Sequence, residues 1–244
     1  MEQIIPCPYT VPTIDEIVKL IDARSYGYDK SRLVSDVLEC GAISISNAVD
    51  FSEAKAREER FARIMKAYDE RGQGAILEIF GKIYALLSSV VYKDGVFNDY
   101  LGEIFMRSNL GDKHNGQFFT PYHVSELMAR IIIDENVVRE KQRKGEILTM
   151  NDPCCGAGGL LLAGLDVMRG YGLNYARNCF IEANDIDARC AYMAYLQLSC
   201  AGAPAVVRHQ DTFSRTTYSV WRTPAYMFQY PRFCKIEEEG RRGV

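Results

Sequence analysis

The sequence is poor in the residues that mark metal centres and membrane-spanning segments. It contains only 3 histidines and 1 tryptophan, and its 8 cysteines never take the paired C-x-x-C spacing of a zinc site. No apolar run approaches the length of a membrane span, and no signal peptide opens the chain. These absences predict a cytoplasmic protein with no metal and no membrane association, whose cysteines are reduced and act as small hydrophobic residues.

Excess positive charge is also missing. The formal net charge of the 244 residues is -3, whereas a free-standing DNA-binding module is usually basic. Any contact with DNA is therefore expected to be local or to be supplied by a partner. The hydrophobic content of 48% and the charged content of 25% are those of an ordinary globular protein with one large or two small domains.

The first part of the chain, residues 1–110, has the apolar spacing of helices. Thr13 to Ile21 places Ile14, Ile17, Val18 and Ile21 on one face of a helix. Further helices are expected over 31–46, 52–68, 73–92 and 97–107. The row Arg57, Arg60 and Arg63 is interpreted as a solvated helix face, with a phosphate contact as the alternative. Residues 139–144 are interpreted as a solvated connector.

The stretch 147–159, ILTMNDPCCGAGG, has the pattern of a strand, a glycine-rich turn and a helix start. Glycines allow the backbone to approach a ligand, and a helix N-terminus offers unpaired N–H groups to an anionic group. The G-x-G-x-x-G loop of dinucleotide-binding proteins has no acid at its start. Here Asp152 lies at the end of the strand, and its carboxylate suits a cationic ligand. S-adenosylmethionine is such a ligand, because it carries two cationic groups, an ammonium and a sulfonium, and only one carboxylate. A glycine-rich turn that binds nothing is the alternative.

Two further strands are expected, each followed by an acid. Residues 179–184 (CFIEAN) precede Asp185, and residues 205–209 (AVVRH) precede Asp211. A carboxylate at the tip of the second strand can accept both ribose hydroxyls of a nucleoside. The alternative is that Asp185 and Asp187 are both helix-start charges; Asp187 is expected to cap the helix over 188–201.

The segment DPCCGAGG resembles the D-P-x-C-G-x-G-G loop of the N-6 adenine DNA methyltransferases of type I restriction-modification systems. A second match is the pair DYLGEIF and NGQFFTP. In those enzymes a helix like DYLGEIF leads into a G-x-F-x-T-P loop, which closes over the methionine end of the cofactor. In this chain that loop comprises Gly116, Phe118, Phe119, Thr120 and Pro121, with Thr120 as N-cap and Pro121 as first residue of the helix that follows.

The resemblance implies S-adenosylmethionine as the cofactor and gives each site residue a role. Asp185 is expected to bind the ribose with Ile186 against the adenine ring, and Asp211 to accept from the adenine amine with Phe213 as a stacking wall. The expected loop contacts are Asp152, Pro153, Cys154, Gly156 and Gly158.

The sequence departs from the family at the catalytic motif. The family has Asn-Pro-Pro-Tyr or Asn-Pro-Pro-Phe, in which an amide oxygen and a proline carbonyl accept the amine hydrogens of adenine and the ring stacks on the extruded base. The nearest segment here is Thr223-Pro224-Ala225-Tyr226, after an expected strand over 218–221. Thr223, Pro224 and Tyr226 are the catalytic candidates; a turn without catalytic meaning explains the segment equally well.

The predicted fold is an α/β chain with a helical domain (1–110) followed by a partial Rossmann-like methyltransferase domain (111–244) that binds S-adenosylmethionine. The leading function is methylation of adenine N6 in DNA within a restriction-modification or mobile-element system, with a partner specificity subunit for DNA recognition. The alternatives are a catalytically degenerate binding module and a methyltransferase for RNA or protein. An oligomer or complex is expected, because the fourth strand lies near a sheet edge with unpaired backbone groups.

Overall fold

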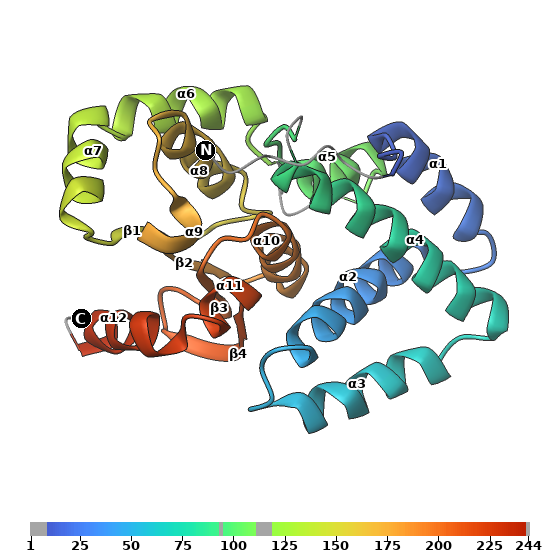
Figure 1. Cartoon of the computed structure of the whole chain (residues 1–244). Coiled ribbons are helices and arrows are strands. Elements are labelled where there is room, and N and C mark those ends of the chain that lie inside the picture. The colour runs from blue at the N-terminus through green and yellow to red at the C-terminus, as the bar shows by residue number, and fades with distance from the viewer. Residues whose placement is uncertain (1–8, 93–94, 111–118, 243–244) are drawn as a thin grey trace.

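The computed structural model describes residues 9–92, 95–110 and 119–242, and in this part of the chain helices surround a single four-stranded sheet (Figure 1). The N-terminal helices lie on the right in Figure 1 and the sheet lies on the left, with α10 between them. Gly116 and Phe118, expected to take part in cofactor binding, fall outside the described residues.

The expected N-terminal helices all form, and acidic or hydroxyl caps start most of them. The Thr13 side chain accepts from the backbone N–H of Glu16 in a capping box, and Asp29, Asp69 and Asp99 cap later helices in the same way. The elements are α1 (Ile14–Arg24), α2 (Lys30–Asn47), α3 (Ala54–Lys66), α4 (Glu70–Ser88), the short 3₁₀ helix η1 (Ser89–Val91) and α5 (Tyr100–Arg107).

The sheet has the order β1-β2-β3-β4. The first three strands, β1 (Leu148–Asp152), β2 (Cys179–Asp185) and β3 (Ala205–Asp211), are parallel, so their carboxyl ends share one edge. Strand β4 (Thr216–Arg222) returns antiparallel to β3 through a turn in which Arg215 has a φ of 58°. The sheet therefore has β1 at one side and β4 at the other, each paired on one side only among the described strands.

The two faces of the sheet are covered unequally. Helices α8 (Gly159–Gly170) and α10 (Ala188–Cys200) pack on one face, where Ile181 and Ala183 of β2 join their hydrophobic cluster. The opposite face receives α11 (Pro224–Met227) and α12 (Tyr230–Arg242), whose Phe233 packs on Phe180 and Val206. The short helix α9 (Tyr175–Asn178) precedes β2.

The region before β1 differs from the sequence expectation in two ways. Helix α6 (Tyr122–Ile132) begins one residue later than expected: Pro121 is the N-cap, and no side chain caps the helix, so Thr120 is not the cap. Residues 139–144 are not a connector. They belong to α7 (Glu135–Lys144), which Asp134 caps and which ends at Gly145 with a φ of 67°.

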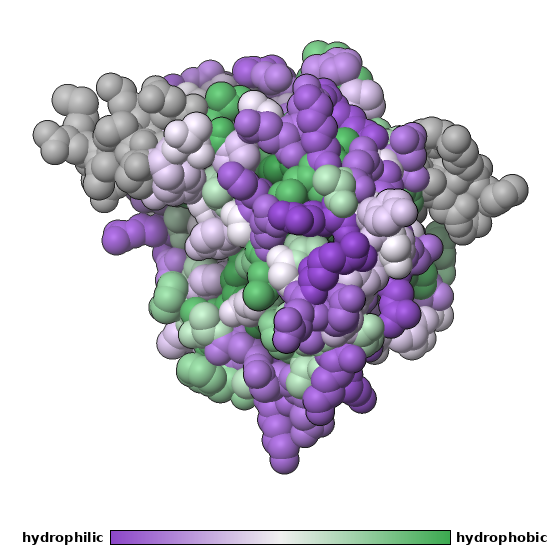
Figure 2. All heavy atoms as spheres, turned by 90° about the vertical axis from the view of Figure 1, so that its right-hand side faces the viewer, coloured by the Kyte–Doolittle hydropathy of each residue, from purple (hydrophilic) through white to green (hydrophobic). Residues whose placement is uncertain are grey.

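Helix α4 with η1 is long and apolar enough, by length and composition alone, to cross a membrane. Its apolar residues have a second explanation, because Ile76, Ile79 and Ile83 are almost fully buried among α1, α2 and α10. The face of the molecule where α1, α3 and α4 lie is mostly hydrophilic, with separate hydrophobic spots (Figure 2). The contacts of α4 are therefore those of the central helix of a packed bundle.

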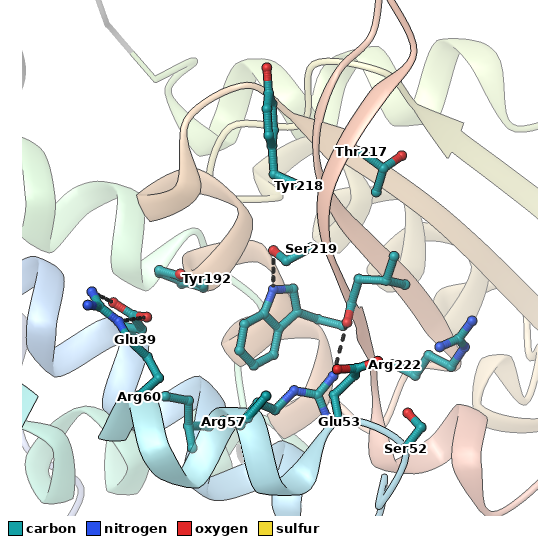
Figure 3. Close-up of a pocket in the computed structure, with 14 residues that line it drawn as sticks. Glu39, Ser52, Glu53, Arg57, Arg60, Tyr192, Thr217, Tyr218, Ser219 and Arg222 are labelled. Atoms are coloured by element: carbon teal, nitrogen blue, oxygen red, sulfur yellow. Dashed lines mark hydrogen bonds and ion pairs between the residues drawn. The ribbon is translucent and has the colours of Figure 1, made fainter. Parts of the chain in front are cut away.

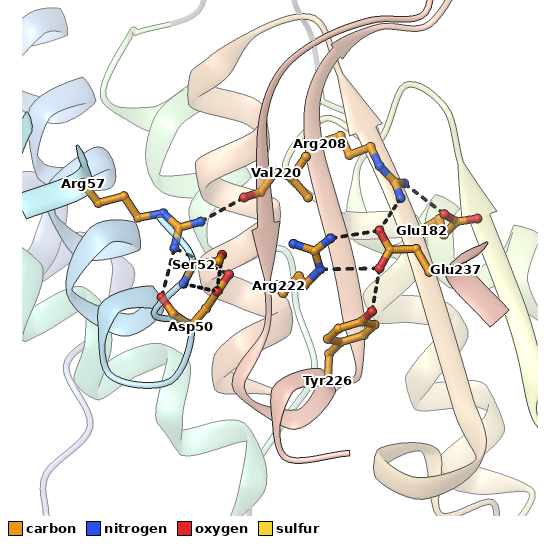
Figure 4. A network of polar contacts seen from close by, with 9 residues as sticks. All are labelled: Asp50, Ser52, Arg57, Glu182, Arg208, Val220, Arg222, Tyr226 and Glu237. Atoms are coloured by element: carbon orange, nitrogen blue, oxygen red, sulfur yellow. Dashed lines mark hydrogen bonds and ion pairs between the residues drawn. The ribbon is translucent and has the colours of Figure 1, made fainter. Parts of the chain in front are cut away.

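The helical part and the sheet share their hydrophobic clusters. Ala42 and Ile43 of α2 join the cluster of α8 and α10, while Met193 and Leu196 of α10 join that of α1, α4 and α5. A polar contact also links the two parts, since Arg57 of α3 donates to the Val220 carbonyl of β4 at 3.1 Å (Figure 4).

This contact corrects the interpretation of the arginine row at Arg57 alone, because Arg60 and Arg63 are exposed as expected. Arg57 is only 8% exposed, lies 3.6 Å from the carboxylate of Asp50 and stacks over the ring of Trp221. Because its guanidinium caps a carbonyl of the edge strand, the chain itself covers part of the β4 edge.

Candidate cofactor site

The glycine-rich loop lies at the carboxyl edge of the sheet, between β1 and α8. Gly156 and Gly158 have φ values of 55° and 93°, the left-handed region that favours glycine. A Cβ on Gly156 would lie 3.1 Å from the ring of Phe119, so the backbone and this ring are in close approach. Helix α8 starts at the loop without a side-chain cap, which leaves its first N–H groups facing the site.

Two carboxylates hold this loop from neighbouring strands. Asp152 accepts from the backbone N–H of Cys154 at 3.1 Å. Asp185 accepts from the N–H of Gly156 at 2.8 Å and from the N–H of Asp187 at 2.9 Å. Asp185 is thus placed as expected at the tip of β2, and Asp187 caps α10 as expected. The alternative that both acids serve only the start of α10 does not explain the bond from Asp185 to Gly156.

Burial raises the pKa of Asp152, and the single hydrogen bond from Cys154 only partly opposes this shift. Burial likewise raises the pKa of Asp185, despite its two backbone donors, and the charges of Asp187 and Asp152 raise it further. Among the described residues, neither of these two carboxylates has a cationic partner. A ligand with an ammonium or sulfonium group would supply one, which is the chemistry that S-adenosylmethionine offers.

A buried network that the sequence analysis missed supports the loop from behind. Gln197 of α10 donates to the Ala157 carbonyl of the loop and to Asp99, both at 2.8 Å, and its oxygen accepts from the N–H of Leu101 at 3.1 Å. Asp99 also accepts from Gly102 at 2.9 Å, and burial raises its pKa. Gln197 sits mid-helix without a neighbouring motif, so only the DYLGEIF segment marked this region in the sequence.

Two adjoining hollows lie beside the loop. The smaller, of about 250 Å³, contacts Asp152, Cys154 and Gly156, and the larger, of about 580 Å³, extends along α5 past Pro121. Both are lined by Asp99, Phe119 and Thr120. The structure thus brings the residues expected at the methionine end, Phe119, Thr120 and Pro121, together with the loop.

The residues expected at the adenine end are more open. Ile186 is 59% exposed and Phe213 is 97% exposed, so neither side chain is covered in this structure. The carboxylate of Asp211 accepts from the backbone N–H groups of Phe213 and Ser214 in the turn before β4, which lowers its pKa. Asp211 thus stabilises the turn in this structure, and its role toward adenine stays a prediction. Pro153 is exposed at the loop, on the opposite side from the hollows.

The catalytic assignment of Thr223, Pro224 and Tyr226 is wrong for this structure. The Thr223 hydroxyl donates to the Ala203 carbonyl at 2.7 Å and accepts from the N–H of Ala205 at 2.9 Å, at the amino end of β3. The glycine loop lies at the carboxyl end of the strands. The distance is about 20 Å, because the six residue steps along β3 each advance about 3.3 Å. The segment is a turn without catalytic contact to the loop.

Tyr226 is likewise structural. It is fully buried between Phe180 and Phe233, and its hydroxyl donates to Glu237 at 2.5 Å (Figure 4). Glu237 also accepts from Arg208 and Arg222, so α12 is tied to β3 and β4 by a buried ionic network. Pro224 is the first residue of α11.

A further pocket, of about 530 Å³, separates α3 from β4 (Figure 3). Three guanidinium groups line it, but each has a carboxylate partner: Arg57 pairs with Asp50, Arg60 with Glu39 and Arg222 with Glu237. The Trp221 indole N–H donates to the Ser219 hydroxyl. With its cations neutralised, this pocket offers little attraction to a phosphate group.

The parallel strands, the glycine loop at their carboxyl edge and the acids that follow them define an α/β protein of the nucleotide- or nucleoside-binding class. The model of the N-6 DNA Methylase family matches residues 95–236, more than half of the chain. The chain therefore belongs to the N-6 DNA methylase family. Neither a search of curated proteins nor a search of solved structures found a significant match.

Proposed function

We propose that this chain binds S-adenosylmethionine at the glycine loop and serves the methylation of adenine N6 in DNA, within a restriction-modification or mobile-element system. The observation that carries the proposal is the pair Asp152 and Asp185, which meet around Gly156 at the carboxyl edge of two parallel strands. When bound, S-adenosylmethionine supplies an electrophilic methyl group. The chain's own residues hold the cofactor: the carboxylates attract its cationic groups, and Phe119 packs over the loop.

Calorimetric titration with S-adenosylmethionine and with its demethylated product tests this proposal. Asp185→Ala should weaken binding by about 1.5–3 kcal/mol, because charged hydrogen bonds are lost. Asp22→Ala, which removes an exposed carboxylate of α1, is the matched control and should leave affinity unchanged. Absence of binding by wild type at millimolar cofactor would refute the proposal.

A catalytically degenerate binding module is the second candidate, and the buried positions of Thr223 and Tyr226 favour it. With those residues at the wrong end of the sheet, the leading proposal requires that a partner supplies the groups that position the adenine amine. A methyl-transfer assay on adenine-containing duplexes tests the degenerate module. Slow or absent transfer by the chain alone fits both candidates, whereas brisk transfer would eliminate the degenerate module.

We further propose that a second copy of the chain covers the open side of β1. Helix α6, which packs on α8, exposes Leu127, Ile131 and Ile132, and the groove between α6, α7 and the strand is largely apolar. Two identical edges can pair about a two-fold axis while their helices bury each other's apolar residues. DNA recognition through a separate specificity subunit remains part of the proposal.

Sedimentation velocity over a range of concentrations tests the dimer. Wild type should sediment as a dimer, and Leu127→Glu combined with Ile131→Glu should give a monomer that keeps the wild-type circular dichroism. The control is Leu77→Glu, which changes an exposed leucine on α4, far from β1. A wild-type monomer at high concentration would contradict the assignment of this surface to a second copy.

A further inference from the structure

Asp99 brings a buried carboxyl group from the start of α5 to the cofactor hollows. Its side chain is only 5% exposed, yet it lines both the smaller hollow beside the glycine loop and the larger one along α5. In the smaller hollow it shares one space with Asp152 of β1. The N-terminal helical part of the chain therefore contributes an acid to the same space as the sheet.

The two oxygens of this carboxyl group have different surroundings. Oδ1 accepts from the backbone N–H of Gly102 at 2.9 Å and from the side-chain amide of Gln197 at 2.8 Å. Oδ2 accepts no hydrogen bond from any residue that the structure describes, and it is not among the unpaired atoms that are closed off from solvent. The protein thus fixes one oxygen and leaves the other open to the hollows as an unused acceptor.

Two glycines keep the space around Oδ2 free of side chains. A Cβ at Gly102 would overlap this oxygen, and a Cβ at Gly159, the first residue of α8, would lie 3.0 Å from it. Neither glycine has a positive φ, so the backbone conformation does not require glycine at these positions. What the two glycines provide is room for the carboxyl group to turn toward the start of α8 and the glycine loop.

No positive charge of the described chain pairs with this carboxyl group. Asp99 forms no ion pair within the described residues, and burial, with a smaller effect of the nearby Glu103 charge, raises its pKa. Glu103 already has partners, because it pairs with Arg107 and accepts from Asn98 at 3.2 Å. A cationic ligand in the hollows would therefore gain more from Asp99 than from Glu103.

The unused acceptor also selects the kind of cation. An ammonium offers three N–H donors, whereas a sulfonium offers none. We infer that Asp99 binds the ammonium group of the cofactor through Oδ2 and makes the site specific for a nucleoside that carries an amino acid. Attraction between charges is stronger at a buried carboxylate than at an exposed one, and the same charge repels the phosphates of a nucleotide. The identity of the ligand rests on the proposed function; the open oxygen and its hollow do not.

Calorimetry with two ligands tests this assignment: the demethylated cofactor, and its deaminated analogue in which hydrogen replaces the amino group. Wild type should bind the demethylated cofactor about ten- to a hundredfold more tightly, because the analogue cannot make the charged hydrogen bond. Asp99→Asn keeps the size of the side chain and an oxygen for the N–H of Gly102, and it should remove most of this preference. Affinity for the analogue should not fall.

Further variants separate ligand binding from the structural role of Asp99 as the cap of α5. Asp99→Ser retains an N-cap oxygen and replaces Asp99→Asn if that variant does not fold. The matched control is Glu103→Gln, one helical turn further on, which changes a carboxylate that already has a partner and should keep the wild-type preference.

Two results would overturn the inference while leaving the proposed function standing. One is equal affinity of wild type for both ligands. The other is a variant that weakens both ligands by the same factor, or that keeps the wild-type preference, because Asp99 would then only support the loop. Failure of wild type to bind either ligand would instead refute the proposed function, and the role of Asp99 with it.

Discussion

Gln197 offers the sharpest test of how the cofactor loop is held. Its side chain is 3% exposed and joins three parts of the fold: Asp99 before α5, Ala157 in the glycine loop and Leu101 in α5. In Gln197→Leu the shape is nearly kept while all three hydrogen bonds disappear. The partners stay buried, so solvent cannot replace what is lost.

The magnitude follows from the kinds of bond. The hydrogen bond to the Asp99 carboxyl group is worth about 1.5–3 kcal/mol if the group is charged, and each of the two neutral bonds is worth about 0.5–1.5 kcal/mol. We therefore expect a loss of about 2.5–6 kcal/mol in the free energy of unfolding, a large share of the roughly 5–15 kcal/mol typical of a domain. Cofactor affinity should fall as well, because Ala157 is no longer fixed.

Urea unfolding followed by circular dichroism measures this loss. The matched control is Gln142→Leu on α7, which removes one exposed hydrogen bond to the Gly172 carbonyl and should cost less than about 1 kcal/mol. If Gln197→Leu stays within about 1 kcal/mol of wild type, the reasoning that the network fixes the loop is refuted.

Two other predictions concern protons and the rejected catalytic turn. The folded-state pKa values of Asp152 and Asp185 lie above the ordinary 3.8, so their stabilising contribution is fully present below pH 3.8 and is lost as pH rises through the raised values. A cationic cofactor reverses this preference, so S-adenosylmethionine should raise the melting temperature more at about pH 7 than at about pH 4, and equal shifts would contradict the carboxylate contacts. Tyr226→Phe should lower the free energy of unfolding by about 1–3 kcal/mol, because Glu237 loses a hydrogen-bond donor. Cofactor affinity measured by calorimetry should stay unchanged. A weaker affinity would indicate that Tyr226 belongs to the cofactor site.

Local patterns in the sequence were sufficient for most elements of the fold. The N-termini of the helices that follow Thr13 and Asp187 could be predicted, because each of these side chains caps backbone N–H groups within a few residues. The glycine loop and Asp185 were also predictable, because in parallel strands the residues at the carboxyl ends meet at one edge of the sheet. Long-range contacts were not predictable. The bonds from Gln197 to Asp99 and from Arg57 to Val220 join residues 98 and 163 positions apart.

The turn before β4 explains why the catalytic assignment failed. In a parallel sheet, a segment that follows a fourth strand would emerge beside the glycine loop. Asp211 instead binds the N–H groups of Phe213 and Ser214, and Arg215 adopts a left-handed conformation, so the chain reverses at once. Strand β4 therefore runs the opposite way.

That reversal decides where the Thr223 segment lies relative to the proposed cofactor site. It delivers Thr223 to the amino end of β3, where its hydroxyl satisfies the backbone of Ala203 and Ala205. The carboxylates proposed to bind the cofactor, Asp152 and Asp185, lie at the carboxyl edge of β1 and β2, at the other end of the strands. Because these carboxylates do not depend on the Asn-Pro-Pro motif, the lack of that motif removes the groups that would position the amine and leaves the proposed cofactor site intact.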